Sequence, residues 1–146
     1  MKRLVFAAAL VLLASSAFGE IQDFGRFSVD VPDGWEVRQE NSTLLLSNKD
    51  KTAAMTITSE ASNGRSAEEL AHSLAGSFRM GFARVSAPQA DPDGSYHWNM
   101  TASNGMDTLA KLSVNGHNYL LLTMTNIASA PGDFAAMLKS IRAKEE

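Results

Sequence analysis

Between residues 26 and 59 the chain alternates apolar and polar residues with the two-residue period of β-strands. The first alternating run, from Phe27 to Val31, meets Pro32-Asp33-Gly34. Proline fixes φ and glycine accepts a positive φ, so this tripeptide predicts a turn. Extended chain then resumes at Trp35, and residues 44–46 and 53–59 predict two further strands. Residues 20–25, ahead of the first strand, carry no such pattern, and we expect them to be loosely held.

Two segments show the helical period instead. Ser66 and Glu69 fit a capping box, in which each side chain bonds the other residue's backbone N–H. Apolar residues then recur at helical spacing: Leu70, Leu74 and Phe78. We predict a helix over residues 67–80, ending near Gly81. A second stripe follows Pro131 and predicts a closing helix: Phe134, Met137, Leu138 and Ile141.

Two Asn-Gly dipeptides mark hairpins in the last third of the chain. Asn-Gly is the strongest short hairpin signal, because a type I′ turn needs a positive φ at both central residues. Asn104-Gly105 and Asn115-Gly116 therefore predict an antiparallel meander of three strands. These strands are expected at residues 96–101, 108–114 and 118–125.

Pairing about the second Asn-Gly makes both faces of the last hairpin largely apolar. The predicted pairs are Leu112 with Tyr119 and Ala110 with Leu121 on one face, and Leu109 with Leu122 and Lys111 with Leu120 on the other. A strand that is apolar on both sides is covered on both sides. The predicted fold class is therefore α+β, with an antiparallel β-sheet meander flanked by helices on both faces.

The first 19 residues have the layout of a secretory signal peptide. Lys2 and Arg3 precede an uncharged apolar run of 11 residues, and Ala17-Phe18-Gly19 supplies the small residues of a cleavage site. A membrane-spanning helix needs about 20 apolar residues, so this run is too short to be an anchor. We expect residues 1–19 to be a signal peptide and residues 20–146 a single domain. The domain is expected to be exported, periplasmic or secreted, without a stable membrane anchor.

Charge and cysteine content narrow the classes of function. Loss of Lys2 and Arg3 would move the formal net charge from −3 to −5. Such a balance argues against nucleic acid as a partner, because phosphates favour a face rich in Lys and Arg. The chain has no cysteine, which excludes disulfides, thiol catalysis and zinc-thiolate sites.

We find no catalytic, cofactor-binding or metal-binding motif. Neither a Gly-x-Ser-x-Gly elbow nor a Gly-rich phosphate loop occurs. Asp91-Pro92-Asp93-Gly94 predicts a polar turn rather than a calcium loop, because position 12 of such a loop is Ala102 instead of glutamate. His97 and His117 are expected about 12 Å apart, too far for an easily shared metal.

Trp35 and Trp98 are the candidate contacts with a ligand or partner. An exposed indole makes an aromatic platform, whereas a buried one is a large core anchor whose N–H needs a partner. The alternating pattern favours a core position for Trp98. Trp35 lies beside a turn, and both interpretations stay open for it.

The order of these elements resembles the PsbP-like and DcrB-like domains. The stretch 27–35 reads F-x-V-x-V-P-x-G-W, and a helix opening Ser66-Ala67-Glu68-Glu69-Leu70, a meander over 96–125 and a closing helix at 134–141 follow. The resemblance covers nearly all of residues 20–146. It implies an α/β/α sandwich shared with a Ran-GTPase-binding protein family. It also implies a non-catalytic accessory, assembly or interaction role.

The favoured functional hypothesis is an exported, non-enzymatic domain that binds another envelope protein or aids its assembly, with no cofactor. The alternative is a binding module for a small apolar ligand, held between sheet and helix near Trp35 or Trp98. The third hypothesis is a hydrolase with an unrecognised site. That hypothesis requires a cleft containing strongly perturbed titratable groups.

Overall fold

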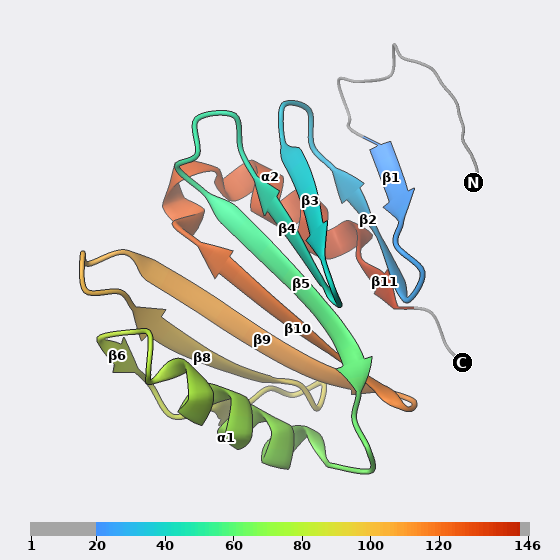
Figure 1. Cartoon of the computed structure of the whole chain (residues 1–146), viewed down its shortest axis with the longest axis vertical. Helices are drawn as coiled ribbons and strands as arrows, with labels where there is room; N and C mark the ends of the chain where they lie inside the picture. Colours follow the sequence, from blue (N-terminus) through green and yellow to red (C-terminus); the bar gives the residue numbers. More distant parts are fainter. Residues whose placement is uncertain (1–19, 144–146) are drawn as a thin grey trace.

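The computed structural model describes residues 20–143, so the predicted signal peptide lies outside the described residues. Two antiparallel sheets and two α-helices make up this range (Figure 1). The large sheet has the order β3-β4-β5-β10-β9-β8-β6, and β7 also pairs with β8. Its strands are β3 (Glu36–Glu40), β4 (Thr43–Ser47), β5 (Ala54–Ala61), β6 (Arg84–Val85), β7 (Gln89–Ala90), β8 (Tyr96–Thr101), β9 (Asp107–Asn115) and β10 (Asn118–Thr125).

The small sheet has the order β1-β2-β11. Its strands are β1 (Glu20–Asp23), β2 (Phe27–Val31) and β11 (Arg142–Ala143). The helices are α1 (Ala67–Phe78), the short 3₁₀ helix η2 (Ile127–Ser129) and α2 (Pro131–Ser140). The prediction of an α+β fold with a large antiparallel sheet and two α-helices is confirmed.

The capping box predicted at the start of α1 is present. Ser66 Oγ accepts a hydrogen bond from Glu69 N at 3.1 Å, and Glu69 Oε1 accepts one from Ser66 N at 3.0 Å. The helix ends at Phe78, two residues before the predicted end. Gly81 N donates to Phe78 O at 3.0 Å, so the last turn tightens into i→i−3 bonding before Gly81 is reached.

Strand β10 lies between two separate hydrophobic cores. Tyr119 and Leu121 belong to the α1 core, which comprises Leu70, Ala71, Ala75, Trp98, Met100, Ala110, Leu112, Tyr119 and Leu121. Leu120 and Leu122 belong to the α2 core, which comprises Phe27, Val29, Val31, Trp35, Leu44, Leu46, Ala53, Met55, Ile57, Leu120, Leu122, Met124, Phe134 and Met137. Successive side chains of a strand point to opposite faces, so the two cores lie on opposite sides of the sheet.

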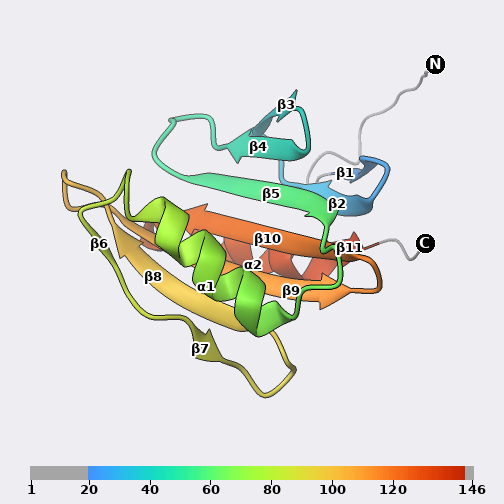
Figure 2. The ribbon, with the colours of Figure 1, turned by 60° about the horizontal axis from the view of Figure 1, so that its bottom comes forward.

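The two cores draw on different halves of the large sheet. The α1 core uses β8, β9 and β10, whereas the α2 core uses β4, β5 and β10, together with β2 of the small sheet. Figure 2 shows α1 in front of β8, β9 and β10, with α2 behind the sheet. Both faces of β10 are therefore buried, while the outer strands are buried on one face each.

The first predicted hairpin is confirmed and the second has a different register. In the second, Leu112 pairs with Leu121 and not with Tyr119. The two central residues are Gly116 and His117, so the turn is one residue later than predicted. Gly116 has a φ of 66°, which suits the first central position of a type II′ turn. Each partner moves by two residues, so every side chain keeps its predicted face.

Residues 20–23 form strand β1, so the expectation that residues 20–25 are loosely held is wrong for these four residues. The strand pairs antiparallel with β2, with Gln22 opposite Val29 and Asp23 opposite Ser28. Its conformation is set by these hydrogen bonds to β2 rather than by its own residues. Local pattern carries no signal for such a strand.

Trp35 joins the turn after β2 to the start of α2. Its Nε1 donates to Asp133 Oδ2 at 2.7 Å, and its ring meets Phe134 edge to face at a centroid distance of 5.6 Å. Phe134 and Met137 of α2 are fully buried beneath it, whereas Leu138, predicted in the same stripe, is 40% exposed. In the last turn of α2, Ser140 Oγ accepts a hydrogen bond from Asp30 N of β2 at 2.8 Å, so both ends of the helix contact the rest of the fold.

We predict that Phe134→Ala lowers the free energy of unfolding by about 3–5 kcal/mol, because it removes a buried ring and leaves a cavity. The matched control is Leu138→Ala on the same helix, expected to cost less than about 1 kcal/mol because Leu138 is partly solvated. Urea unfolding of both variants measures the difference. Similar losses for the two would show that α2 does not pack as described.

Candidate functional site

Within residues 20–143, no element covers the α2 side of the half-sheet formed by β8 and β9. We call this surface the open face, and define it by His97, Asn99, Thr101, Asp107, Leu109 and Lys111. These residues pair directly across the two strands, His97 with Lys111, Asn99 with Leu109 and Thr101 with Asp107. Their opposite neighbours Trp98 and Ala110 are buried in the α1 core. The open face is thus the solvated side of β8 and β9, whose other side packs in the α1 core.

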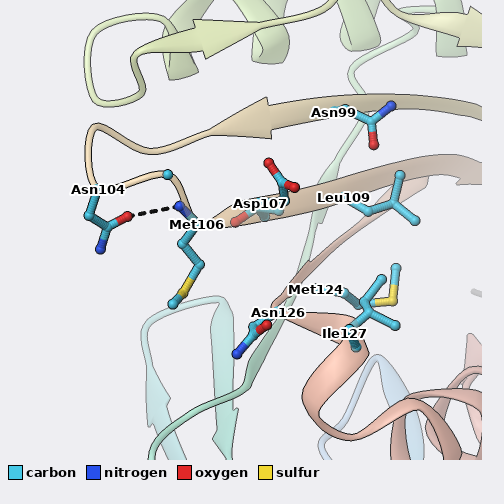
Figure 3. A pocket seen from close by; sticks show the side chains of 11 residues that line it. Asn99, Asn104, Met106, Asp107, Leu109, Met124, Asn126 and Ile127 are labelled. Carbon is cyan, nitrogen blue, oxygen red and sulfur yellow. Dashed lines mark hydrogen bonds between the residues drawn. The ribbon is translucent and has the colours of Figure 1, made fainter.

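An apolar hollow of about 570 Å³ lies at one end of the open face (Figure 3). Leu109, Met124 and Ile127 supply its apolar lining, and Asn99 and Asp107 lie at its edge. Figure 3 shows these side chains coming from β8, β9, β10 and the start of η2. The hollow therefore lies at the border of the α2 core, beside the start of η2.

Asn126 makes the bend that brings η2 beside this hollow. It has a left-handed φ of 59°, a conformation that asparagine tolerates better than most residues. Its Nδ2 donates to Thr52 O at 2.7 Å, and its backbone N donates to Asp107 O at 3.0 Å. These two bonds fix Ile127 at the edge of the open face.

A second hollow of about 630 Å³ lies at the other end and shares Asn99 and Leu109 with the first. Its lining contains more charged residues, and we call it the polar hollow. His97 and Lys111 line it from the sheet, and the turn 91–94 lines it from the side. The two hollows share lining residues and lie next to each other along the open face, and we call the two together the groove. From Asp107 to Lys111 it extends about 14 Å, at about 3.4 Å per residue of strand.

The turn predicted at Asp91-Pro92-Asp93-Gly94 is organised by Ser95, which is 3% exposed. Ser95 N donates to Asp93 Oδ1 at 3.0 Å, and its Oγ lies 2.6 Å from the same oxygen and 3.2 Å from Asp91 Oδ2. These bonds from the Ser95 hydroxyl and backbone lower the pKa of Asp93, and the charge of Lys111 lowers it further. Lys111 Nζ is 3.9 Å from Asp93 Oδ2.

His97 and Asp91 form a second side-chain pair within the polar hollow. Its Nδ1 lies 2.7 Å from Asp91 Oδ1. An ionised carboxylate only accepts hydrogen bonds, so Nδ1 carries the proton and Nε2 is the free ring nitrogen. An Asp–His pair of this kind can orient an imidazole for proton transfer. Here the nearby hydroxyl of Ser95 is directed at the two carboxylates instead of the imidazole.

The structure gives no further titratable signal of a reaction centre in this groove. Asp93 is the lining residue with a shifted pKa, and its hydrogen bonds within the turn account for the shift. Among residues 20–143, no group of three or more His, Cys, Asp or Glu side chains is arranged to bind a metal ion. The hydrolase hypothesis therefore gains no support from the groove.

The structure places the two predicted contact residues in the cores. Trp98 is fully buried in the α1 core, and its Nε1 has no hydrogen-bond partner among the described residues. Trp35 is 8% exposed and belongs to the α2 core. Neither lines the apolar or the polar hollow. Contact of either indole with a ligand stays a prediction.

Sequence reasoning missed the open face as a candidate site. The alternation of His97 and Asn99 with the buried Trp98 is a signal that one side of β8 is solvated. For β9 the same reasoning counted Leu109 and Lys111 on an apolar, covered face. The elements that cover this side of the sheet, α2 and η2, extend only as far as β10. A local sequence pattern cannot predict where a distant helix ends.

Comparison with solved structures identifies the architecture. The solution structure of cyanobacterial PsbP (CyanoP) from Synechocystis sp. PCC 6803 superposes with a TM-score of 0.55 at 7% identity, covering 88% of this chain and 94% of that one. The fold is PsbP-like. The predicted resemblance to that fold is therefore confirmed.

A crystal structure from Bacteroides thetaiotaomicron VPI-5482 also matches, with a TM-score of 0.52 at 14% identity over 88% of this chain. The matched region spans about half, 49%, of that longer protein. No family model matches the sequence, and no curated protein matches it significantly. The PsbP-like similarity is therefore one of fold, carried by structure rather than by sequence.

Neither described α-helix could cross a lipid bilayer, since each is too short and too polar in the range 20–143.

We predict that Ser95→Ala raises the pKa of Asp93 towards its ordinary value, because both the hydroxyl and the turn geometry that lower it are disturbed. The lowered pKa means that these bonds favour the carboxylate. Their stabilisation is present above the ordinary pKa and is lost as the pH falls through the lowered one. Carboxyl-detected NMR titration measures the shift.

Ser66→Ala is the matched control for this titration. The Ser66 backbone N–H and the Ser66 hydroxyl both lower the pKa of Glu69, so removal of the hydroxyl should raise that pKa while leaving Asp93 unchanged. An unchanged Asp93 titration in the Ser95 variant would show that Ser95 does not organise the turn.

Proposed function

We propose that this protein is an exported, non-enzymatic accessory domain that binds another protein of the cell envelope through the open face. The observation that carries the proposal is the incomplete cover of the sheet. One side of β8 and β9 is packed against α1, and the other side presents a groove with polar and apolar lining. The PsbP-like fold adds support, because the related domains named above act as accessory or assembly proteins.

The groove has the mixed surface of a protein-binding site. Leu109 is partly buried at its centre, and Met106 is 38% exposed at its edge. Asn99 and Asp107 lie exposed beside them. Protein interfaces combine an apolar centre with a polar rim in this way, and strands anchored from behind need little rearrangement to bind.

The predicted signal peptide supports the choice of an envelope partner. The basic start, the short apolar run and the small residues before Glu20 fit a signal peptide. The absence of cysteine is compatible with an oxidising compartment, since no free thiol is exposed to oxidation there.

A small apolar ligand is the second candidate, favoured by the apolar hollow. A hollow of about 570 Å³ lies within the usual range of ligand sites. Leu109, Met124 and Ile127 would contact such a ligand. A ligand in this hollow would lie away from Trp35 and Trp98, the two positions that the sequence suggested.

We predict that a photo-crosslinking amino acid at position 99 captures an envelope protein in the producing cells, because Asn99 lies at the centre of the groove. The control is the same amino acid at position 68, which is exposed on α1 on the opposite side of the sheet. Mass spectrometry identifies the product. The expected result is a reproducible partner from position 99 and none from position 68.

Two results would count against protein binding through this groove. One is monomer alone from position 99; the other is the same partner from both positions at equal yield. Native mass spectrometry of the purified protein then tests the second candidate. A bound small molecule, displaced by Leu109→Trp, would support a ligand site in the apolar hollow.

A further inference from the structure

Asp107 is a carboxylate without a cationic partner at the edge of the apolar hollow. Thr101 Oγ1 donates to its Oδ1 at 3.0 Å, and no ion pair joins it to a Lys, Arg or His among residues 20–143. The side chain is exposed. By contrast, the two carboxylates at the other end of the groove already have partners, because Asp93 pairs with Lys111 and Asp91 bonds His97 Nδ1. The groove therefore carries an unneutralised negative charge at its apolar end.

Asn99 presents an unused carboxamide between the two hollows. Its backbone is fixed at the sheet edge, because its N–H donates to Ser86 Oγ at 2.9 Å and its carbonyl accepts from Ser86 N at 2.8 Å. Its side-chain amide makes no hydrogen bond with any described residue, although the residue lines both hollows. A carboxamide offers a donor and an acceptor together, which matches the C=O and N–H of a peptide group.

The spacing of these features fits an extended polypeptide. Asp107 and Leu109 lie on the same side of β9, two residues and so about 7 Å apart. In an extended segment, side chains two residues apart also share a side at this spacing. Such a segment can place one side chain beside Asp107 and the side chain two residues further along over Leu109 and Met124. The carboxamide of Asn99 can then reach the backbone of the segment.

Resting on the function proposed above, we propose that the open face binds an extended segment of the partner protein that carries Lys or Arg two residues from a large apolar side chain. The cation pairs with Asp107, and the apolar side chain fills the hollow lined by Leu109, Met124 and Ile127. The carboxamide of Asn99 bonds the peptide group between them. Asp91 and Asp93 at the other end already bond His97 and Lys111, so the proposal assigns the segment no contact with them.

The test begins from the segment that is captured at position 99 and sequenced by mass spectrometry. This segment is synthesised with a fluorescent label. Its binding to the purified protein without the predicted signal peptide is measured by fluorescence anisotropy. Asp107→Asn is expected to weaken binding about tenfold, the loss of one charge-assisted bond. Replacing the segment's Lys or Arg by Gln should cause a similar loss in the wild-type protein and little further loss in the variant.

The matched control is Asp50→Asn, which removes an exposed carboxylate from the turn before β5 and should leave affinity unchanged. Asp107→Glu keeps the charge and should retain most of the affinity, which separates pairing from a structural effect on the loop. Equal unfolding midpoints verify that the variants are folded.

The outcomes separate this inference from the function on which it rests. A captured segment without Lys or Arg, or full affinity in Asp107→Asn, would overturn the inference and leave protein binding at the open face intact. A small molecule in place of a protein at position 99 would overturn both.

Discussion

The rest of the structure depends on the burial of β10 on both of its faces. Its four consecutive residues from Tyr119 to Leu122 are all buried, because alternate side chains enter the α1 core and the α2 core. Such a strand must be central, and it pairs along its whole length with β5 and β9. One helix on each side of the sheet, α1 on one and α2 on the other, is then enough to bury β10. Neither cover extends across the whole sheet, and the sheet's two halves are consequently covered on opposite faces.

This offset arrangement leaves two uncovered half-faces with different chemistry. On the α1 side, β4, β5 and β10 present threonines that pair with one another across the strands. Thr43 and Thr58 hydroxyls lie 2.8 Å apart, and the hydroxyls of Thr56 and Thr123 also pair. Cross-strand threonine pairs of this kind stabilise a sheet and satisfy their own hydroxyls.

How much of this could be predicted from the sequence depends on the range of the interaction concerned. Features set within a few residues were predictable: the capping box at Ser66, both hairpins and the inward positions of the strands. Even with the wrong register at Gly116, the faces of Leu112 and Leu121 were right, because a shift of two residues preserves the alternation. The fold class followed from the same local patterns.

Features set by distant segments were not predictable. Strand β1 exists through its pairing with β2, and the exposure of Leu109 and Lys111 depends on where α2 and η2 end. Trp35 shows the same limit: its place beside a turn left its burial open, and its contact with Asp133, 98 residues away, decides it. The candidate site was missed for this reason. Whether a sheet face is exposed depends on how far the helices packed on it extend, which the residues of the face do not encode.

The contrast between the two uncovered half-faces indicates which of them is suited to binding. Burying a polar group against a partner costs free energy unless the partner replaces its hydrogen bonds. The threonine face already satisfies its hydroxyls internally, so a partner gains little there from polar contacts. The open face differs, because the amide of Asn99 and the charge of Asp107 are directed to solvent beside an apolar hollow. A partner with complementary groups would gain both contacts while it covers the partly buried Leu109, and this combination supports the proposal that β8 and β9 are the binding half of the sheet.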